Sequence, residues 1–100
     1  MVIAEISIVP IGTGTPSVSQ YVARAIQTLG QESNIKYKLT GMGTILEGTW
    51  TSVLEAAKKM HDSVFDDQIQ RVVTTIKIDD RRDRESSVER KIQSVAKKLK

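Results

Sequence analysis

Two short segments of the chain combine glycine with hydroxyl side chains, a composition that can line the binding site of a small polar ligand. The first is GTGTPS, residues 12–17, and the second is LTGMGTILEG, residues 39–48; together they hold five of the six glycines. Glycine lets the backbone turn through positive φ and leaves N–H groups bare, while threonine suits strands and helix caps. Such groups side by side can bind anions and polar ring substituents, so both segments supply candidate ligand contacts.

The first segment departs from the two common phosphate-binding motifs. The dinucleotide fingerprint G-x-G-x-x-G needs a third glycine where Ser17 stands, and no Gly-Lys-Ser/Thr ending completes a P-loop. What remains is a strand-to-helix loop whose N–H groups, with Ser17 and Ser19, can face the positive end of a helix. Gly12 and Thr13 are candidate contacts from this loop, and a plain connecting loop is an equally good interpretation.

Catalytic and metal-binding arrangements find little support in the sequence. The chain has no cysteine, which excludes disulfides, thiolate metal sites and cysteine nucleophiles. Its one histidine, His61, lies on or beside the apolar stripe of an expected helix, where a hydrogen-bonded core or boundary histidine is favoured over a catalytic one. One histidine with scattered carboxylates gives no metal-ligand spacing. We therefore predict a protein that is not an enzyme and has neither a metal nor a resident cofactor.

The elements that would position these residues alternate strands and helices, in the order βαββαβ with one helix appended. Apolar and β-branched runs predict strands at residues 2–9, 35–40, 44–48 and 71–79, with a hairpin turning at 41–43. Capping boxes predict three helices that begin at Ser17, Ser52 and Ser86, and the first is expected to end at Gly30 in a left-handed conformation. The expected buried stripe of the second helix consists of Val53, Ala57, Met60 or His61, Val64 and Phe65.

This order predicts a four-stranded sheet with its first and third strands in the centre and both crossing helices on one face. The other face would mix polar and apolar side chains: Glu5, Ser7, Glu47, Thr75 and Lys77 with Ile3, Val9, Ile45 and Val73. Such a face predicts packing against another subunit, with a ligand held at the seam. The last helix has a narrow stripe typical of a helix docked on one surface, formed by Val88, Ile92, Val95 and Leu99.

Length and charge narrow the class of protein further. The 100 residues support a single domain, 1–100, and no apolar run approaches the roughly 20 residues of a membrane span, so we expect a cytoplasmic protein without a membrane partner. The net charge of +3 is concentrated in residues 88–100, which carry +4 and leave the remainder at −1. A solvated basic helix face is therefore favoured over a nucleic-acid surface.

Three known uses of this element order need residues that the chain lacks. RNA-binding modules need aromatic side chains on the two central strands, metal chaperones need Cys-x-x-Cys, and acylphosphatases need an arginine in the first loop. Their absence leaves two interpretations: a module that binds a small molecule, and a purely structural oligomer.

Three segments resemble a known family. AEISIVPIGTGTPSVSQYV, YKLTGMGTILEG and VVTTIKIDDRRD are similar to segments of the small cytoplasmic thiamine-binding proteins, and the similarity runs from Val2 to Lys100. The resemblance implies a ferredoxin-like α+β subunit that assembles into homodimers or homotetramers and binds thiamine or its hydroxymethylpyrimidine moiety without catalysis. An amino-acid or nucleotide sensor of similar architecture is the alternative.

A thiamine-type ligand presents an aminopyrimidine edge and, in thiamine itself, a thiazolium cation, and a carboxylate can bind both. Glu5 and Glu47 are therefore the first candidates, on neighbouring central strands of the face without helices. Two interpretations stay open for them: contact with the ligand, or pairing with Lys77 or Lys38 across the sheet. The full set of candidate ligand-binding residues is Glu5, Ser7, Gly12, Thr13, Thr40, Met42, Gly43, Thr44, Glu47 and Thr75.

Overall fold

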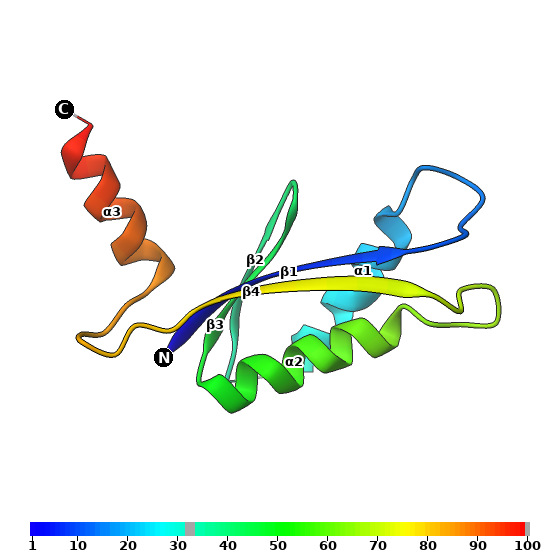
Figure 1. The fold of residues 1–100 in the computed structure, drawn as a ribbon, viewed down its shortest axis with the longest axis horizontal. Helices are drawn as coiled ribbons and strands as arrows, with labels where there is room; N and C mark the ends of the chain where they lie inside the picture. The colour runs from blue at the N-terminus through cyan, green and yellow to red at the C-terminus, as the bar shows by residue number, and fades with distance from the viewer. Residues whose placement is uncertain (32–33, 100) are drawn as a thin grey trace.

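A four-stranded antiparallel sheet carries two helices on one face and leaves most of its other face uncovered (Figure 1). The computed structural model describes residues 1–31 and 34–99. The strand order β2-β3-β1-β4 places β1 and β3 in the centre, as predicted, and the fold is ferredoxin-like with one added helix. In chain order the elements are β1 (Val2–Pro10), α1 (Ser19–Gln27), the 3-10 helix η1 (Thr28–Gln31), β2 (Lys36–Thr40), β3 (Gly43–Gly48), α2 (Trp50–Ser63), β4 (Val72–Asp79) and α3 (Val88–Lys98).

The register of the strands separates the two faces of the sheet. Glu5 lies opposite Ile45 on β3 and opposite Lys77 on β4, and Ser7 lies opposite Thr75. Facing residues of antiparallel strands share a side of the sheet, so these groups occupy the face without α1 and α2, as predicted. We call this surface the open face; it also carries Ile3, Val9, Glu47 and Val73.

The opposite face of the sheet packs under α1 and α2. The predicted stripe of α2 is confirmed at Val53, Ala57, Met60 and Val64, whereas Phe65 is 40% exposed because the helix has already ended at Ser63. Burial contributes about 25 cal/mol per Å² of apolar surface and fixes both helices over the sheet. The central strands and the two helices supply most of this core, with Val2, Ala4, Ile6, Leu46, Tyr21, Ala25, Val53, Ala56, Ala57 and Met60.

The helices begin at other residues than the capping boxes predict. α1 begins two residues after Ser17, and its N-cap, Val18, makes no side-chain hydrogen bond. Thr49 caps α2 by accepting a hydrogen bond from the N–H of Ser52 at 3.2 Å, and Ser87 caps α3. Thr49 and Ser87 have the extended backbone that an N-cap requires. The capping boxes instead name Ser52, which follows the N-cap of α2, and Ser86, which precedes the N-cap of α3.

The prediction that Gly30 ends α1 in a left-handed conformation is also wrong. Gly30 lies inside η1, which tightens the end of the helix without positive φ. Among the described residues, positive φ occurs at Gly12 and Gly14, with φ of 86° and 76°. These two glycines shape the loop between β1 and α1, which is the conformational role expected of GTGTPS.

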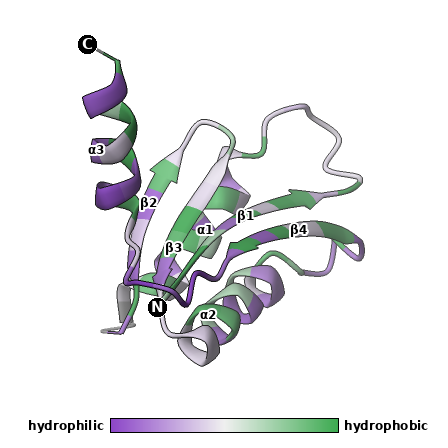
Figure 2. Cartoon of the chain, turned by 60° about the vertical axis from the view of Figure 1, so that its left-hand side comes forward, coloured by the Kyte–Doolittle hydropathy of each residue, from purple (hydrophilic) through white to green (hydrophobic). Residues whose placement is uncertain are grey.

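The last helix, α3, stands apart from α1 and α2 in both views (Figures 1 and 2). The docked stripe that the sequence predicts is not formed within one chain, because Ile92, Val95 and Leu99 are 56%, 59% and 78% exposed. Figure 2 shows hydrophobic segments between hydrophilic ones along this helix. Within the part of the chain that the structure describes, no helix is long and apolar enough to cross a membrane.

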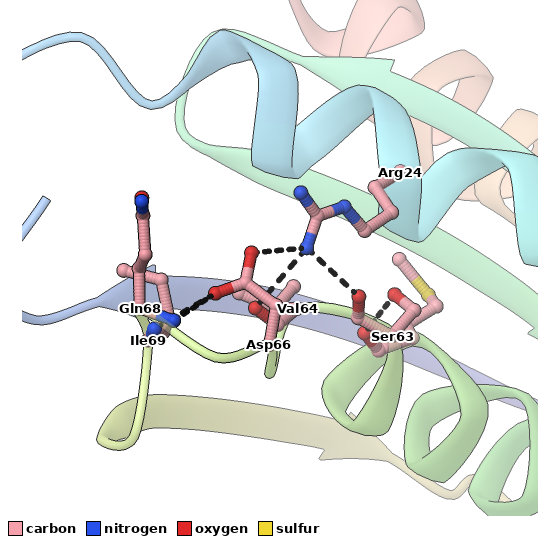
Figure 3. Close-up of polar contacts among 7 residues, drawn as sticks. Arg24, Ser63, Val64, Asp66, Gln68 and Ile69 are labelled. Atoms are coloured by element: carbon pink, nitrogen blue, oxygen red, sulfur yellow. Dashed lines mark hydrogen bonds and ion pairs between the residues drawn. The ribbon is translucent and has the colours of Figure 1, made fainter.

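A cluster of polar contacts ties α1 to the end of α2 (Figure 3). The Arg24 guanidinium on α1 lies 3.1 Å from Asp66 Oδ2 and donates to two carbonyl oxygens at the end of α2, at 3.5 Å each. Asp66 Oδ1 accepts hydrogen bonds from the backbone N–H groups of Ile69 and Gln68, both at 2.8 Å. These backbone bonds, followed by the bond from Arg24, hold the pKa of Asp66 below its ordinary value of 3.8.

Replacing Asp66 by alanine should therefore lower the melting temperature at pH 7. Because the folded-state pKa is lowered, the carboxylate stabilises the fold above its ordinary pKa, and this contribution is lost as pH falls through the lowered value. The difference between wild type and Asp66→Ala should accordingly shrink in thermal melts below about pH 4. Asp67→Ala is the matched control, because the exposed Asp67 forms no hydrogen bond with the rest of the described chain. Equal melting temperatures for the two variants at pH 7 would contradict the role given to Asp66.

Candidate functional site

A pocket of about 170 Å³ lies between α1, β1 and the tip of the β2–β3 hairpin. We call it the hairpin pocket. Its walls are mainly apolar side chains from β1, α1 and α2: Ile6, Ile8, Val18, Val22, Ala25 and Met60. Its rim and its polar wall contain five of the residues predicted from the sequence, Ser7, Thr40, Met42, Gly43 and Thr44.

The pocket exists because β3 stops pairing with β1 before β1 ends. β1 pairs with β3 only as far as Ile6, which lies opposite Thr44, whereas it pairs with β4 as far as Pro10. Beyond Ile6, the side of β1 that faced β3 therefore has no strand beside it, and residues 7–9 line the pocket. An unpaired strand edge offers backbone N–H and C=O groups to a ligand.

Gly43 marks the point where the strands separate. A Cβ atom at this position would lie 2.8 Å from the carbonyl oxygen of Ile6, closer than side-chain carbons approach a backbone atom. The absence of a side chain lets the hairpin pass directly beside β1 at the edge of the pocket. Gly41, two residues earlier in the turn, has open space around it.

Thr44 supplies the buried hydroxyl of the pocket. The residue is 3% exposed, and across residues 1–31 and 34–99 its side chain forms no hydrogen bond. No fully enclosed polar side-chain atom in the described chain lacks a partner, so this hydroxyl is reached from the pocket itself. Thr44 thus lies on the helix-covered side of β3, opposite the buried Ile6, whereas Ile45 and Glu47 lie on the open face.

The neighbouring hydroxyl, Thr40, holds the hairpin turn. Its Oγ1 donates to the carbonyl oxygen of Gly43 at 2.8 Å and accepts from the N–H of Met42 at 3.3 Å. Met42 is 85% exposed at the tip, beside Leu39, which is 56% exposed. The pocket therefore has an apolar outer rim on a turn that Thr40 fixes.

The two candidate carboxylates lie on the open face and have partners there. The Glu5 carboxylate lies 3.7 Å from Lys77 Nζ, with the side chains 42% and 81% exposed. Glu47 Oε1 accepts a 2.6 Å hydrogen bond from the N–H of Val88, the first residue of α3. The pairing of Glu5 with Lys77 is one of the two interpretations that the sequence leaves open, whereas the bond from Glu47 to α3 is not visible in any local sequence pattern.

The open face adds a second concave surface beside Glu47. A hollow of about 500 Å³ lies between α3 and the strands β2 and β3, and its lining includes Tyr37, Lys38, Ile45, Glu47 and Ile92. It combines two carboxylates, Glu47 and Glu89, with two lysines and several apolar side chains, so it is a place on the open face where a ring and a positive charge could be held together.

Three other candidates lie away from the hairpin pocket lining. Gly12 and Thr13 form the loop after β1, where the Thr13 hydroxyl donates to the carbonyl oxygen of Thr15. Thr75 is exposed on the open face opposite Ser7. The structure therefore divides the predicted set among the hairpin pocket, the open face and this loop.

His61 has the role expected of a boundary histidine. Its Nδ1 lies 2.6 Å from Thr74 Oγ1 on β4, and its ring meets Phe65 edge-on at a centroid distance of 5.2 Å. In the described residues no group of three or more histidine, aspartate and glutamate side chains is arranged to hold a metal ion.

Sequence reasoning missed the apolar half of the pocket. Val22 lies on α1 and Val18 is the N-cap four residues before it, a spacing that places both on one side of the helix, and Met60 comes from α2. Their pattern is that of core residues, and only the early separation of β1 and β3 makes them line a pocket.

Comparison with known proteins finds a matching family and several similar chains. A family model described as thiamine-binding protein matches residues 4–96. The UPF0045 protein YqgV of Bacillus subtilis is 44% identical over 102 residues, covering 99% of this chain and 98% of that protein. A UPF0045 protein of Methanothermobacter thermautotrophicus is 41% identical over 99% of this chain and 100% of its own length.

Solved structures share the fold. The protein MJ1052 of Methanocaldococcus jannaschii superimposes with a TM-score of 0.87 at 41% identity, covering 95% of each chain. A structure from Thermotoga maritima, described as that of a proposed thiamine biosynthesis/salvage protein, has a TM-score of 0.76 at 20% identity. It covers 94% of this chain and 97% of that one, and at this identity the likeness concerns the fold alone.

Substituting Gly43 by alanine should destabilise the protein by about 1–3 kcal/mol, because the new methyl group would press against the Ile6 carbonyl oxygen and force the strands apart. Chemical denaturation monitored by circular dichroism measures this loss. Gly41→Ala is the matched control in the same turn, where a Cβ meets open space and φ is not positive. If both variants unfold at the same denaturant concentration, the close approach at Gly43 does not limit the structure.

Proposed function

Because the chain belongs to the thiamine-binding protein family, we propose that it binds thiamine, or the hydroxymethylpyrimidine moiety of thiamine, in the hairpin pocket and without catalysis. The observation that carries this proposal is the Thr44 hydroxyl, which is buried, opens into an apolar pocket and makes no hydrogen bond within the described chain. A buried hydroxyl gains stability when a ligand supplies the missing partner.

The size of the hairpin pocket fits one aromatic ring better than a whole larger ligand. Its volume of about 170 Å³ is below the roughly 300–1,000 Å³ of pockets that enclose drug-sized molecules. A pyrimidine could insert between the apolar side chains of α1 and β1, while the rest of thiamine would remain at the rim. Met42 at that rim can pack against a ring through its flexible thioether side chain.

The polar groups of the pocket match an aminopyrimidine edge. Such an edge presents an amino donor next to a ring-nitrogen acceptor, and a strand edge presents carbonyl acceptors and N–H donors in alternation. The stretch of β1 beyond Ile6 lines the pocket without a neighbouring strand on that side, and Thr44 adds a hydroxyl that can donate or accept. This combination of groups supports a heteroaromatic ligand over a purely apolar one.

The open-face carboxylates offer the competing location for the ligand. The hollow beside Glu47 could hold the thiazolium cation of thiamine, but Glu47 already accepts the bond from Val88, Glu89 accepts one from Gln93, and Glu5 faces Lys77. A ligand there would have to displace or share these partners. The proposal therefore gives Thr44 the larger effect on affinity and the carboxylates the smaller one.

Assembly into homodimers or homotetramers is part of the proposal. The open face exposes apolar side chains such as Val9 and Val73, 44% and 47% exposed, and α3 exposes Ile92 and Val95. Surfaces of this kind are covered when copies of a chain associate. Val9 also lines the hairpin pocket, so a subunit packed against this part of the open face would lie close to the pocket mouth.

Isothermal titration of thiamine and of hydroxymethylpyrimidine tests the location of the site. Thr44→Val should weaken binding by roughly three- to tenfold, because the ligand loses one hydrogen bond inside an apolar pocket. Thr44→Ser keeps the hydroxyl and should retain most of the affinity. Glu5→Gln and Glu47→Gln should stay within about twofold of wild type under this proposal, since neither carboxylate lines the pocket.

Three outcomes of this titration would contradict the proposal. Loss of tenfold or more in either glutamine variant, with Thr44→Val unchanged, would move the site to the open face. If amino acids or nucleotides bind and neither thiamine compound does, a sensor of similar architecture is favoured. If no ligand binds, a structural oligomer is favoured.

Light scattering at micromolar concentration should show a species of at least twice the 11.1 kDa chain mass. Replacing the exposed Ile92 by aspartate places a charge in the apolar stripe of α3 and should shift the protein toward smaller species, because charge is disfavoured in a buried contact. Gln93→Asp on the same helix, outside that stripe, is the control. A single 11.1 kDa species for the wild type would refute assembly.

A further inference from the structure

A third concave surface, of about 600 Å³, lies between α3 and the loop that follows β4. We call it the basic hollow. One carboxylate, Glu85, lines it together with six basic side chains, Arg81, Arg84, Arg90, Lys91, Lys97 and Lys98. It shares no lining residue with the hairpin pocket, so it is a separate feature of the molecule.

Acidic neighbours neutralise only part of this charge. Arg81 pairs with Asp83, and Lys91 pairs with Asp79 at the end of β4. The Arg81 pair holds the pKa of Asp83 at about 2, so both partners stay charged near neutral pH. Neither of these two ion pairs involves the other four basic side chains that line the hollow.

The remaining basic groups form no salt bridge within the described residues, although the charge of Arg84 also acts on Asp83. Arg84, Lys97 and Lys98 form no ion pair, and the guanidinium of Arg90 donates to the backbone carbonyl of Glu85 at 3.3 Å. That bond orients Arg90 at the hollow without cancelling its charge. Glu85 is the one carboxylate in the lining of the hollow itself.

The hollow also supplies neutral hydrogen-bond donors. The hydroxyls of Ser86 and Ser94 line it from the loop and from α3. Guanidinium groups bind phosphate oxygens through paired N–H donors, ammonium groups bind them as point charges, and hydroxyls add further bonds. A ligand with several phosphate oxygens would satisfy this set better than a single carboxylate could.

We propose that the basic hollow binds a small polyphosphate anion, whether the phosphate chain is free or attached to an organic group. A single-stranded nucleic acid is the less suitable occupant, because the lining contains no aromatic side chain on which bases could stack. The lining residues and the ligand chemistry of this hollow differ from those of the hairpin pocket, so the two proposals can be tested separately.

Calorimetric titration of the intact protein with inorganic tripolyphosphate and with ATP tests the proposal at two salt concentrations. Both ligands should bind, and more weakly at the higher salt, because exposed charges are screened. Similar affinities would indicate that the phosphate chain alone is recognised, whereas tighter binding of ATP would indicate an organic carrier as the natural source. Removing two of the unpaired cations with Arg84→Gln/Lys97→Gln should weaken binding of both ligands by about five- to tenfold.

The double variant Arg71→Gln/Lys58→Gln removes the same charge from outside the hollow and is the matched control. It should bind both phosphate ligands within about twofold of wild type. The proposal is overturned if neither ligand binds at millimolar concentration, if the two double variants lose affinity equally, or if a single-stranded oligonucleotide binds more tightly than tripolyphosphate. Thiamine affinity should be the same in all three proteins, so failure here is distinguishable from failure of the hairpin-pocket proposal.

Discussion

The close approach of β3 to β1 at Gly43, followed at once by the separation of the two strands, is the constraint on which the candidate site depends. Pairing continues to Ile6 and Thr44 and then stops, while β1 runs on beside β4 to Pro10. Beyond Ile6, β1 thus keeps β4 as a neighbour on one side and has no neighbouring strand on the other. The apolar residues of α1 would be ordinary core residues if β3 continued, and they line a pocket because it does not.

The charged residues have a different role from the pocket residues, because they position α3. Glu47 and Asp79 lie near the ends of their strands and hold α3 through the Val88 N–H and Lys91. The helix has few other ties to the body of the chain, and its side chains are exposed over most of its length. Acidic groups on the sheet therefore position a basic helix, which leaves the rest of that helix and its loop with excess positive charge.

Much of the fold could be predicted from the sequence, because the spacing of apolar residues along a strand or helix indicates which side chains are buried. Alternation along residues 2–9 and 71–79 assigns the correct side chains to the open face, and the element order leads to the observed strand order. Helix starts are less predictable, since adjacent serines and threonines offer competing caps and the backbone decides between them, as at Thr49 and Ser52. The exposure of α3 could not be read from its stripe, because the same pattern serves a helix packed on its own chain and a helix packed on another.

The candidate site was predictable in its residue types and not in its grouping. The sequence brings Thr40, Met42, Gly43 and Thr44 together through the hairpin, and these do line one pocket. Alternation along β3 puts Thr44 on the opposite side of the sheet from Glu47, so the predicted ligand contacts divide between the two faces. Where pairing between two strands ends is a tertiary property, so the contribution of Val18, Val22 and Met60 required the structure.

Nuclear magnetic resonance of the labelled protein titrated with hydroxymethylpyrimidine tests the central claim most directly, because it reports the location of the ligand residue by residue. The hairpin-pocket site predicts that the largest shift changes fall on Thr44, Val22 and Met42. Changes centred instead on Glu5, Glu47 and Thr75, with Thr44 and Val22 unaffected, would contradict it and place the ligand on the open face.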